Sequence, residues 1–143
     1  MPTNGQGYDM MCLENWSTYI FNNGLSKIYF SGTDYPPLYH YILWIFSNIQ
    51  GSIESIHNNL YLLKGITLVF DFIAGFILIK FLSEKYTDKN QIFIMSFFYF
   101  LNFFVLYNTI IWGQVDGIMT CFIFISFYFA YRNKILISIL FYL

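Results

Sequence analysis

The sequence predicts an all-α polytopic membrane protein, and three observations lead to this prediction. Hydrophobic residues make up 57% of the 143 residues and charged residues only 10%, whereas about 25% of a soluble domain is charged. Mean hydropathy is +0.54. Long apolar stretches at 60–82, 91–111 and 116–131 are separated by short polar breaks. The first of them would form a helix about 34 Å long, which is enough to cross a bilayer.

Residues 1–59 are expected to form an outer loop region. Apolar residues recur at helical spacing between residues 9 and 22, which predicts an amphipathic helix. Pro36 and Pro37 then open a second apolar run, residues 36–49. That run is only about 14 residues long, whereas a spanning helix needs about 20. We therefore expect a juxtamembrane helix that lies along the bilayer surface.

Residues 60–143 are expected to hold the transmembrane helices. The breaks at 83–90 and 132–134 carry basic residues, and basic residues favour the cytoplasmic side. Two spans separate these breaks, so both can lie inside. The hexapeptide at 112–117 between the two spans then lies outside, together with the start of the helix at 60–82. The final apolar run, 135–143, would be about 13 Å long and is too short to cross.

The hexapeptide Trp112-Gly113-Gln114-Val115-Asp116-Gly117 is a polar segment between two apolar runs. A carboxylate in this place is costly in hydrocarbon, so Asp116 is expected at the water interface or in a polar cavity. The alternative is a short loop in which Asp116 only caps the following helix. If residues 36–49 lie flat, Asp9 shares the outer face with Asp116, and the two form a candidate catalytic pair. The alternative for Asp9 is helix N-capping.

Several classes of function receive no support from the sequence. The net charge is -1, so no basic surface points to nucleic acid. There is no nucleotide-binding loop and no zinc-site spacing. Cys12 and Cys121 lie in segments of opposite character and give no sign of pairing.

The order of these motifs resembles the N-terminal half of bacterial GT-C-type membrane glycosyltransferases, the relatives of GPI mannosyltransferases. More distantly it resembles the oligosaccharyltransferase catalytic subunit and the protein O-mannosyltransferases. The resemblance covers most of residues 7–134. It rests on Gly7-Tyr8-Asp9, Tyr29, Tyr35-Pro36-Pro37-Leu38-Tyr39, the intramembrane Lys64 and Asp71, and Trp112-Gly113-Gln114-Val115-Asp116.

The resemblance implies a partial GT-C-type helical module in a multi-pass integral membrane protein of the bacterial inner membrane, or of the ER membrane in a eukaryote. Such enzymes move a hexose, for example mannose, from a polyprenyl-phosphate donor to a glycan, lipid or protein acceptor on the outer or luminal face. Asp9 matches the acid of the first outer loop and Asp116 that of the second. Family members have a transmembrane helix before the first acid and several more spans, so we expect a fragment.

By this resemblance the reaction inverts the sugar and uses a carboxylate base. Asp9 is the expected base, because a positioned carboxylate that takes the hydroxyl proton gains about 10²- to 10⁴-fold in rate. Asp116 is expected to orient the acceptor. Gln114 stands where a metal site would need a second acid, and hard cations want several carboxylate oxygens. We therefore expect no metal and no cofactor.

Tyr35, Lys64, Trp112 and Gln114 are the expected substrate-binding residues. Lys64 contacts the lipid phosphate of the donor in this interpretation, and snorkels to the headgroups in the alternative. Trp112 serves as an interfacial anchor or as a platform for the sugar. Lys64 and Asp71 share a helix face but lie about 10 Å apart along the axis, too far for a direct ion pair.

Two other classes of function remain open. A transporter or flippase could line a polar pathway with Lys64, Asp71 and Asp116, because intramembrane ionisable residues mark such pathways. A small structural membrane protein without activity is the third interpretation. The Tyr-Pro-Pro segment beside a short interfacial helix favours the glycosyltransferase, because a transporter has no need of a juxtamembrane acid such as Asp9.

Overall fold

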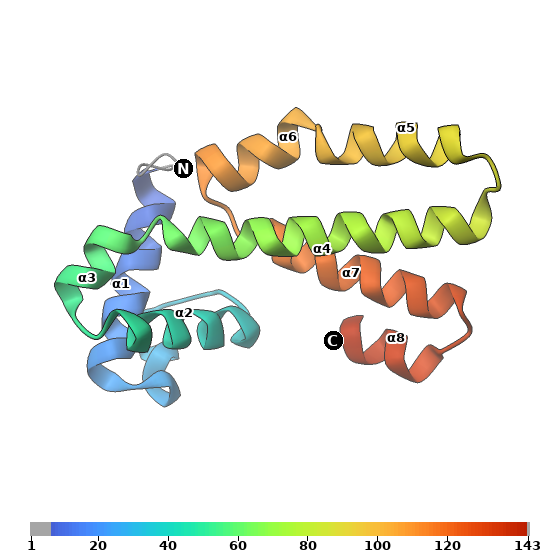
Figure 1. Ribbon diagram of the computed structural model, residues 1–143. Helices are drawn as coiled ribbons and strands as arrows, with labels where there is room; N and C mark the ends of the chain where they lie inside the picture. Colours follow the sequence, from blue (N-terminus) through green and yellow to red (C-terminus); the bar gives the residue numbers. More distant parts are fainter. Residues whose placement is uncertain (1–6, 143) are drawn as a thin grey trace. The chain divides into compact units, whose positions relative to one another are not determined.

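The computed structural model describes residues 7–142 and divides into two compact units, Met1–Leu63 and Lys64–Leu143 (Figure 1). Every regular element among the described residues is helical, and none of them is a β-strand. The all-α class predicted from composition is therefore confirmed.

The described part of the first unit, residues 7–63, contains three α-helices and one 3-10 helix. Left-handed glycines punctuate it: Gly24, with φ 82°, follows the first helix, and Gly51, with φ 69°, ends the third element. Positive φ suits glycine because it lacks a Cβ. The elements are α1 (Gly7–Asn23), η1 (Leu25–Ser31), α2 (Pro37–Gln50) and α3 (Ile53–Asn59).

Helix α1 packs against α2 along a stripe of buried side chains. Leu13 and Ile20 of α1 are 2% and 1% exposed, and Leu43 of α2 is fully buried. The spacing of seven between Leu13 and Ile20 places both on one helix face. Ser47 on α2 donates its hydroxyl to the Ser17 carbonyl of α1 at 2.9 Å. The amphipathic pattern between residues 9 and 22 thus corresponds to α1, and the double-proline run to α2.

The sequence pattern gave no helix between residues 50 and 59, yet the structure forms α3 there. Ser52 is the N-cap, and its hydroxyl accepts the Ser55 amide at 3.1 Å. A capped helix start satisfies an otherwise unpaired N–H group. Ile56 is fully buried and anchors this short helix in the unit.

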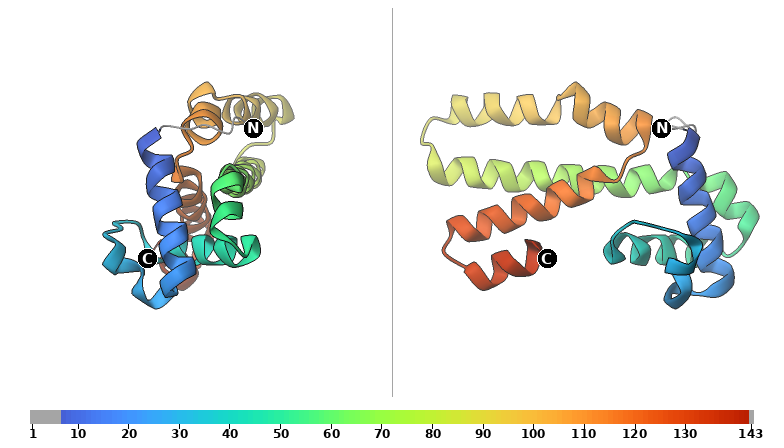
Figure 2. Two further views of the ribbon diagram at one scale, coloured as in Figure 1. Left: turned by 90° about the vertical axis from the view of Figure 1, so that its left-hand side faces the viewer. Right: turned by 180° about the vertical axis from the view of Figure 1, so that it is seen from behind.

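The second unit is built around one long helix, α4 (Leu62–Lys85), whose first two residues lie at the boundary between the units. A hairpin leads to a broken helical stretch and then to a second hairpin, in which α8 folds back along α7 (Figure 2). Phe129 of α7 stacks on Phe141 of α8 with centroids 6.1 Å apart. The remaining elements are α5 (Lys89–Phe100), α6 (Phe103–Leu106), the π-helical turn η2 (Tyr107–Trp112), α7 (Asp116–Tyr131) and α8 (Ile135–Tyr142).

The expected single helix over residues 91–111 is interrupted. Helix α5 ends at Phe100, and the Asn102 side chain accepts the Phe104 amide at 2.9 Å to start a new helix. Asparagine competes with the helical backbone through such local hydrogen bonds. The polar Asn102 therefore divides an apolar stretch that hydropathy alone reads as continuous.

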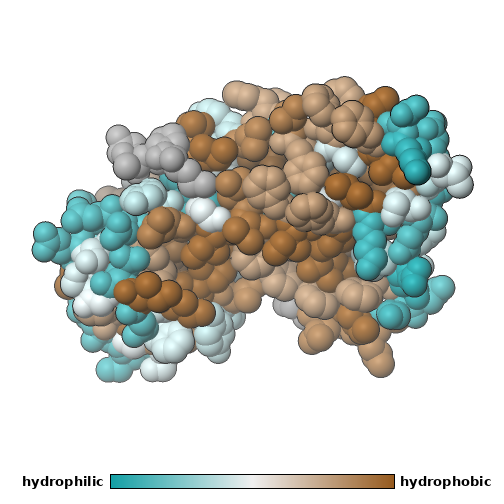
Figure 3. Space-filling view, in the orientation of Figure 1, coloured by the Kyte–Doolittle hydropathy of each residue, from teal (hydrophilic) through white to brown (hydrophobic). Residues whose placement is uncertain are grey.

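Two segments are long and apolar enough to cross a membrane: Leu62–Lys85 and Lys89–Trp112, each of 24 residues. Helix α7 is a shorter apolar helix. Apolar side chains cover the visible face of the second unit, and hydrophilic ones gather at the end where α4 meets the turn before α5 (Figure 3). Large exposed side chains such as Phe76, at 63%, and Phe98, at 70%, are typical of a surface that faces lipid.

Helices α4 and α7 run in the same direction. Thr109, which lies before the start of α7, donates to Asp71 near the middle of α4. At their ends, Glu84 of α4 accepts hydrogen bonds from Tyr128 and Arg132 at the end of α7. The hexapeptide therefore precedes α7 beside the middle of α4, and the basic breaks lie where the two helices end.

Candidate functional site

A pocket of about 440 Å³ lies in the first unit, between the N-terminal half of α1 and the segment that leads into α2. Asp9 and Tyr35, two of the residues selected from the sequence, both line it. Asp9 lies inside the first turn of α1, which begins at Gly7. Trp16 forms another part of the wall, so the pocket combines a carboxylate with aromatic surfaces.

The position of Tyr35 is fixed by an aromatic row. Its ring centroid is 4.8 Å from that of Trp16 on α1 and 5.4 Å from that of Tyr39 on α2. Tilted and edge-on ring pairs at such distances are favourable beyond the area they bury. Tyr39 is buried, and burial raises the pKa of its phenol. Tyr35 therefore presents to the pocket a ring that is held between two aromatic neighbours.

Sequence reasoning missed a second carboxylate in this pocket, Asp34. The signal was its place directly before Tyr35-Pro36-Pro37, where an extended segment leads into a helix. Cys12 raises the pKa of the exposed Tyr8 phenol, and Asp34 and Asp9 act in the same direction. Both carboxylates thus act electrostatically on one side chain at the pocket rim.

The segment that carries Asp34 is tied to α2 through His40. Thr33 Oγ1 lies 3.0 Å from His40 Nε2, and the imidazole is only 1% exposed. The other ring nitrogen, Nδ1, is buried without a hydrogen-bond partner among the described residues. Burial lowers the pKa of His40. A protonated His40 would leave a buried N–H unpaired, so the neutral form is the one that fits.

Acidification is therefore expected to destabilise the first unit. Because the folded-state pKa of His40 is lowered, the unfolded state binds the proton more readily, and stability falls as pH drops below about 6.5. One proton gives a slope of at most about 1.4 kcal/mol per pH unit. The measurement is the thermal midpoint between pH 7.5 and 5, followed by tryptophan fluorescence. His40→Gln should flatten this pH dependence. His57→Gln is the control, because the His57 imidazole is exposed and bonded to Glu14, and it should keep the dependence. The reverse result would contradict the role of His40.

In the second unit, Asp116 is an exposed residue at the start of α7. Val115 is the N-cap and makes no side-chain cap bond, so the view of Asp116 as a simple helix cap is wrong. The Asp116 carboxylate instead accepts a hydrogen bond from the Asn108 amide at 3.1 Å. Asn108 lies on the π-helical turn η2, and such turns are frequent at functional sites.

Asp71 of α4 buttresses the start of α7. Thr109 donates its hydroxyl to Asp71 Oδ2 at 2.6 Å, and both side chains are buried. A Cβ placed on Gly117 would collide with the Asp71 carboxylate. Glycine at this position thus permits close approach of α7 to α4, and Asp116 is held next to that contact.

Lys64 is 2% exposed, so it does not snorkel to the surface in this structure. Its ammonium donates to the Ile110 carbonyl of η2 at 3.2 Å. Asp71 accepts a hydrogen bond from Thr109, the residue before Ile110. Thr67 shares this buried face of α4. The polar face of α4 therefore supports the turn that precedes the hexapeptide.

The other two expected ligands lie on the hexapeptide itself. Trp112 is 41% exposed, and its ring meets Tyr107 edge-on at 6.3 Å. Gln114 is half-buried, and its backbone amide donates to the Asn108 carbonyl at 3.1 Å. The structure thus gathers Lys64, Trp112, Gln114 and Asp116 around η2 in the second unit, and Asp9 with Tyr35 in the first.

Among residues 7–142, no group of three His, Cys, Asp or Glu side chains is placed to hold a metal ion. Comparison of the chain with known proteins gives no match to a family model, to a curated protein or to a solved structure. The functional proposal therefore rests on the Asp9 pocket and on the residues around η2.

Proposed function

We propose that this chain is part of a polytopic membrane glycosyltransferase that moves a hexose from a polyprenyl-phosphate donor to a hydroxyl acceptor at the outer face. The observation that carries the proposal is the pocket that both Asp9 and Tyr35 line. A carboxylate beside aromatic rings suits a sugar. The rings pack against the apolar faces of the sugar, and the carboxylate accepts a hydroxyl proton.

The proposed step is a single displacement at the anomeric carbon. The acceptor oxygen forms a bond to C1 as the bond from C1 to the phosphate oxygen breaks, and the configuration inverts. Asp9 takes the hydroxyl proton. The leaving group is a phosphate that already carries charge, so it needs hydrogen-bond donors and cations more than an acid.

The proposal places both acids on one side of the bilayer. Helices α4 and α7 run in the same direction, and α7 begins beside the middle of α4, which puts Asp116 at the end of α7 opposite the basic breaks. Lys80, Lys85 and Arg132 mark the other end, and basic residues favour the cytoplasm. Under the proposal, α2 lies along the outer surface, and Asp9 shares that face with Asp116.

Sidedness is tested by single cysteines at positions 9, 54 and 116, introduced one at a time in a Cys12→Ser and Cys121→Ser background. A membrane-impermeant maleimide is added to intact cells or to sealed inverted vesicles. We expect all three positions to label from outside, since Glu54 and Asp116 are exposed. A cysteine at Lys85 is the matched control and should label only from the inside. Labelling of positions 9 and 116 from opposite faces would end the proposal.

A transporter is the second candidate, and one observation favours it. Lys64, Thr67 and Asp71 form a continuous buried polar face along α4. Such a face inside a membrane helix can line a pathway for an ion or polar substrate. A vesicle flux assay separates the two candidates. A transporter should show flux in the wild type that Asp71→Asn lowers. The glycosyltransferase proposal expects no flux in the wild type, so Asp71→Asn has none to lower.

A further inference from the structure

An apolar groove of about 460 Å³ lies between α4 and α7, near the ends of both helices. Ile77, Leu78 and Phe81 of α4 form one wall, and Phe124, Phe127 and Tyr131 of α7 belong to the other. Cavities of this size hold a substantial ligand. This lining is mostly apolar and suits a hydrocarbon chain.

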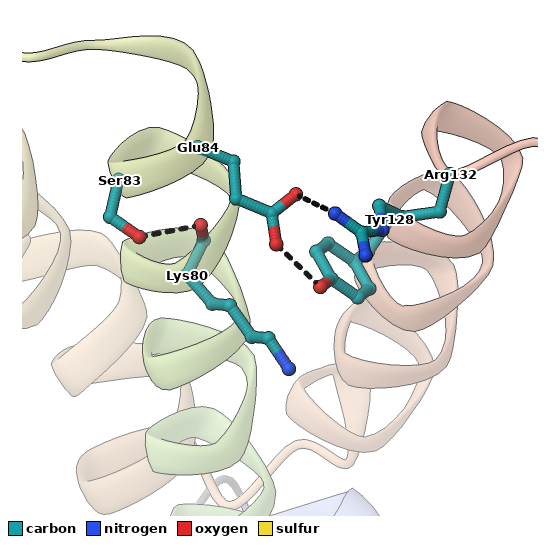
Figure 4. Close-up of polar contacts among 5 residues, drawn as sticks. All are labelled: Lys80, Ser83, Glu84, Tyr128 and Arg132. Carbon is teal, nitrogen blue, oxygen red and sulfur yellow. Dashed lines mark hydrogen bonds and ion pairs between the residues drawn. The ribbon is translucent and has the colours of Figure 1, made fainter.

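One end of this groove carries a charged cluster, drawn in Figure 4. Glu84 accepts the Tyr128 hydroxyl at 2.8 Å and Arg132 Nη1 at 3.2 Å. The Lys80 ammonium lies over the Tyr128 ring, 5.2 Å from its centroid. Tyr128 also lines the groove, so the charged cluster and the apolar groove adjoin through one side chain.

The cluster has a net positive charge, because Lys80 and Arg132 together outweigh Glu84. Lys80 forms no ion pair with a carboxylate in the part of the chain that the structure describes. Arg132 uses one guanidinium nitrogen for Glu84, and a guanidinium has five N–H donors in all. Both cations therefore have capacity for an anion, and arginine and lysine both bind phosphate well.

We propose that the groove and this cluster together bind an anionic phospholipid. One acyl chain lies in the groove, and the phosphate binds Lys80 and Arg132. Charge complementarity selects this occupant, because another apolar helix would fill the groove but leave the excess positive charge unmatched. The site is separate from the Asp9 pocket and from the residues around η2, and the proposal does not depend on hexose transfer.

The test uses native mass spectrometry of the full chain in detergent, titrated with phosphatidylglycerol or with phosphatidylcholine of the same acyl chains. We expect phosphatidylglycerol to bind more tightly. Lys80→Gln should weaken it about fivefold, and Lys80→Gln with Arg132→Gln about 25-fold, on the basis of about fivefold for each cation removed. Lys85→Gln removes the same charge but should have no such effect, because the Lys85 ammonium lies over Tyr86, which does not line the groove.

Two further variants separate a binding site from a merely structural cluster. Glu84→Gln keeps an acceptor for Tyr128 and Arg132 but removes the negative charge, so phosphatidylglycerol should bind more tightly than to the wild type. Ala130→Trp fills the groove, which Ala130 lines, and should abolish binding of the lipid. Equal binding of the two lipids, or unchanged phosphatidylglycerol affinity in the Lys80→Gln/Arg132→Gln variant, would overturn the proposal. A dimer mass without lipid adducts would assign the groove to a second copy instead.

Discussion

Replacing Asp9 with asparagine is expected to slow hexose transfer about 10²- to 10⁴-fold. The amide keeps the size of the side chain in the pocket beside Tyr35 but cannot take the acceptor proton. The loss should fall on kcat, with the Michaelis constant for the donor little changed, because the proton moves only in the transition state. The measurement is the release of polyprenyl phosphate from a polyprenyl-phosphate hexose by the protein in nanodiscs.

Asp34→Asn is the matched control for this experiment, because it makes the same isosteric change in the wall of the same pocket. Its effect on kcat should be much smaller than that of Asp9→Asn. A large loss for Asp34→Asn with near-normal turnover for Asp9→Asn would transfer the role of base to Asp34. Equal wild-type rates for both variants would remove a carboxylate base from this pocket altogether.

Replacing Gly117 with alanine is expected to destabilise the second unit. The new Cβ meets the Asp71 carboxylate, which is short and held by Thr109 at 2.6 Å, so it cannot move without losing that bond. Overpacking of this kind costs about 1–3 kcal/mol, and the better helix preference of alanine returns at most about 1 kcal/mol. The measurement is the free energy of unfolding from a titration of the detergent-solubilised protein with sodium dodecyl sulfate.

Gly65→Ala is the control, because Gly65 is also helical and a Cβ there meets nothing within 4 Å. It should leave stability unchanged or raise it slightly, since only the helix preference acts. A double-mutant cycle of Gly117→Ala with Asp71→Ala should show a coupling of about 0.5–3 kcal/mol, as expected for residues in contact. If both glycine variants behave alike, the close approach of α7 to Asp71 has no energetic weight.

The positions of most helices could be predicted from the sequence, because hydrophobic periodicity and run length are local properties. The pattern over residues 9–22 and the run at 60–82 correspond to α1 and α4 to within three residues at each end. The break at Asn102 could not be seen, because it depends on one side chain that competes for backbone amides. Helix α3 was missed because its Ser52 cap precedes a mostly polar segment.

The candidate site was only partly predictable. Asp9, Tyr35 and Asp116 could be selected from their sequence context, but the partners that position them come from elsewhere in the fold. Asp34 reaches the pocket through the conformation of the segment before α2. The contact of Asp71 with Thr109 and Gly117 joins residues far apart in the chain. Sequence periodicity places residues on a helix face but does not say which helix that face meets.

The two cysteines stand in different surroundings. Cys12 lines the pocket with Asp9 and is half-buried, whereas Cys121 is 1% exposed within α7. The native chain thus carries its own reporter of occupancy. A molecule that binds beside Asp9 should protect the Cys12 thiol from alkylation, while the buried Cys121 thiol should not react in either case. The natural ligand can therefore be sought in unfractionated lipid extracts with the unmodified sequence.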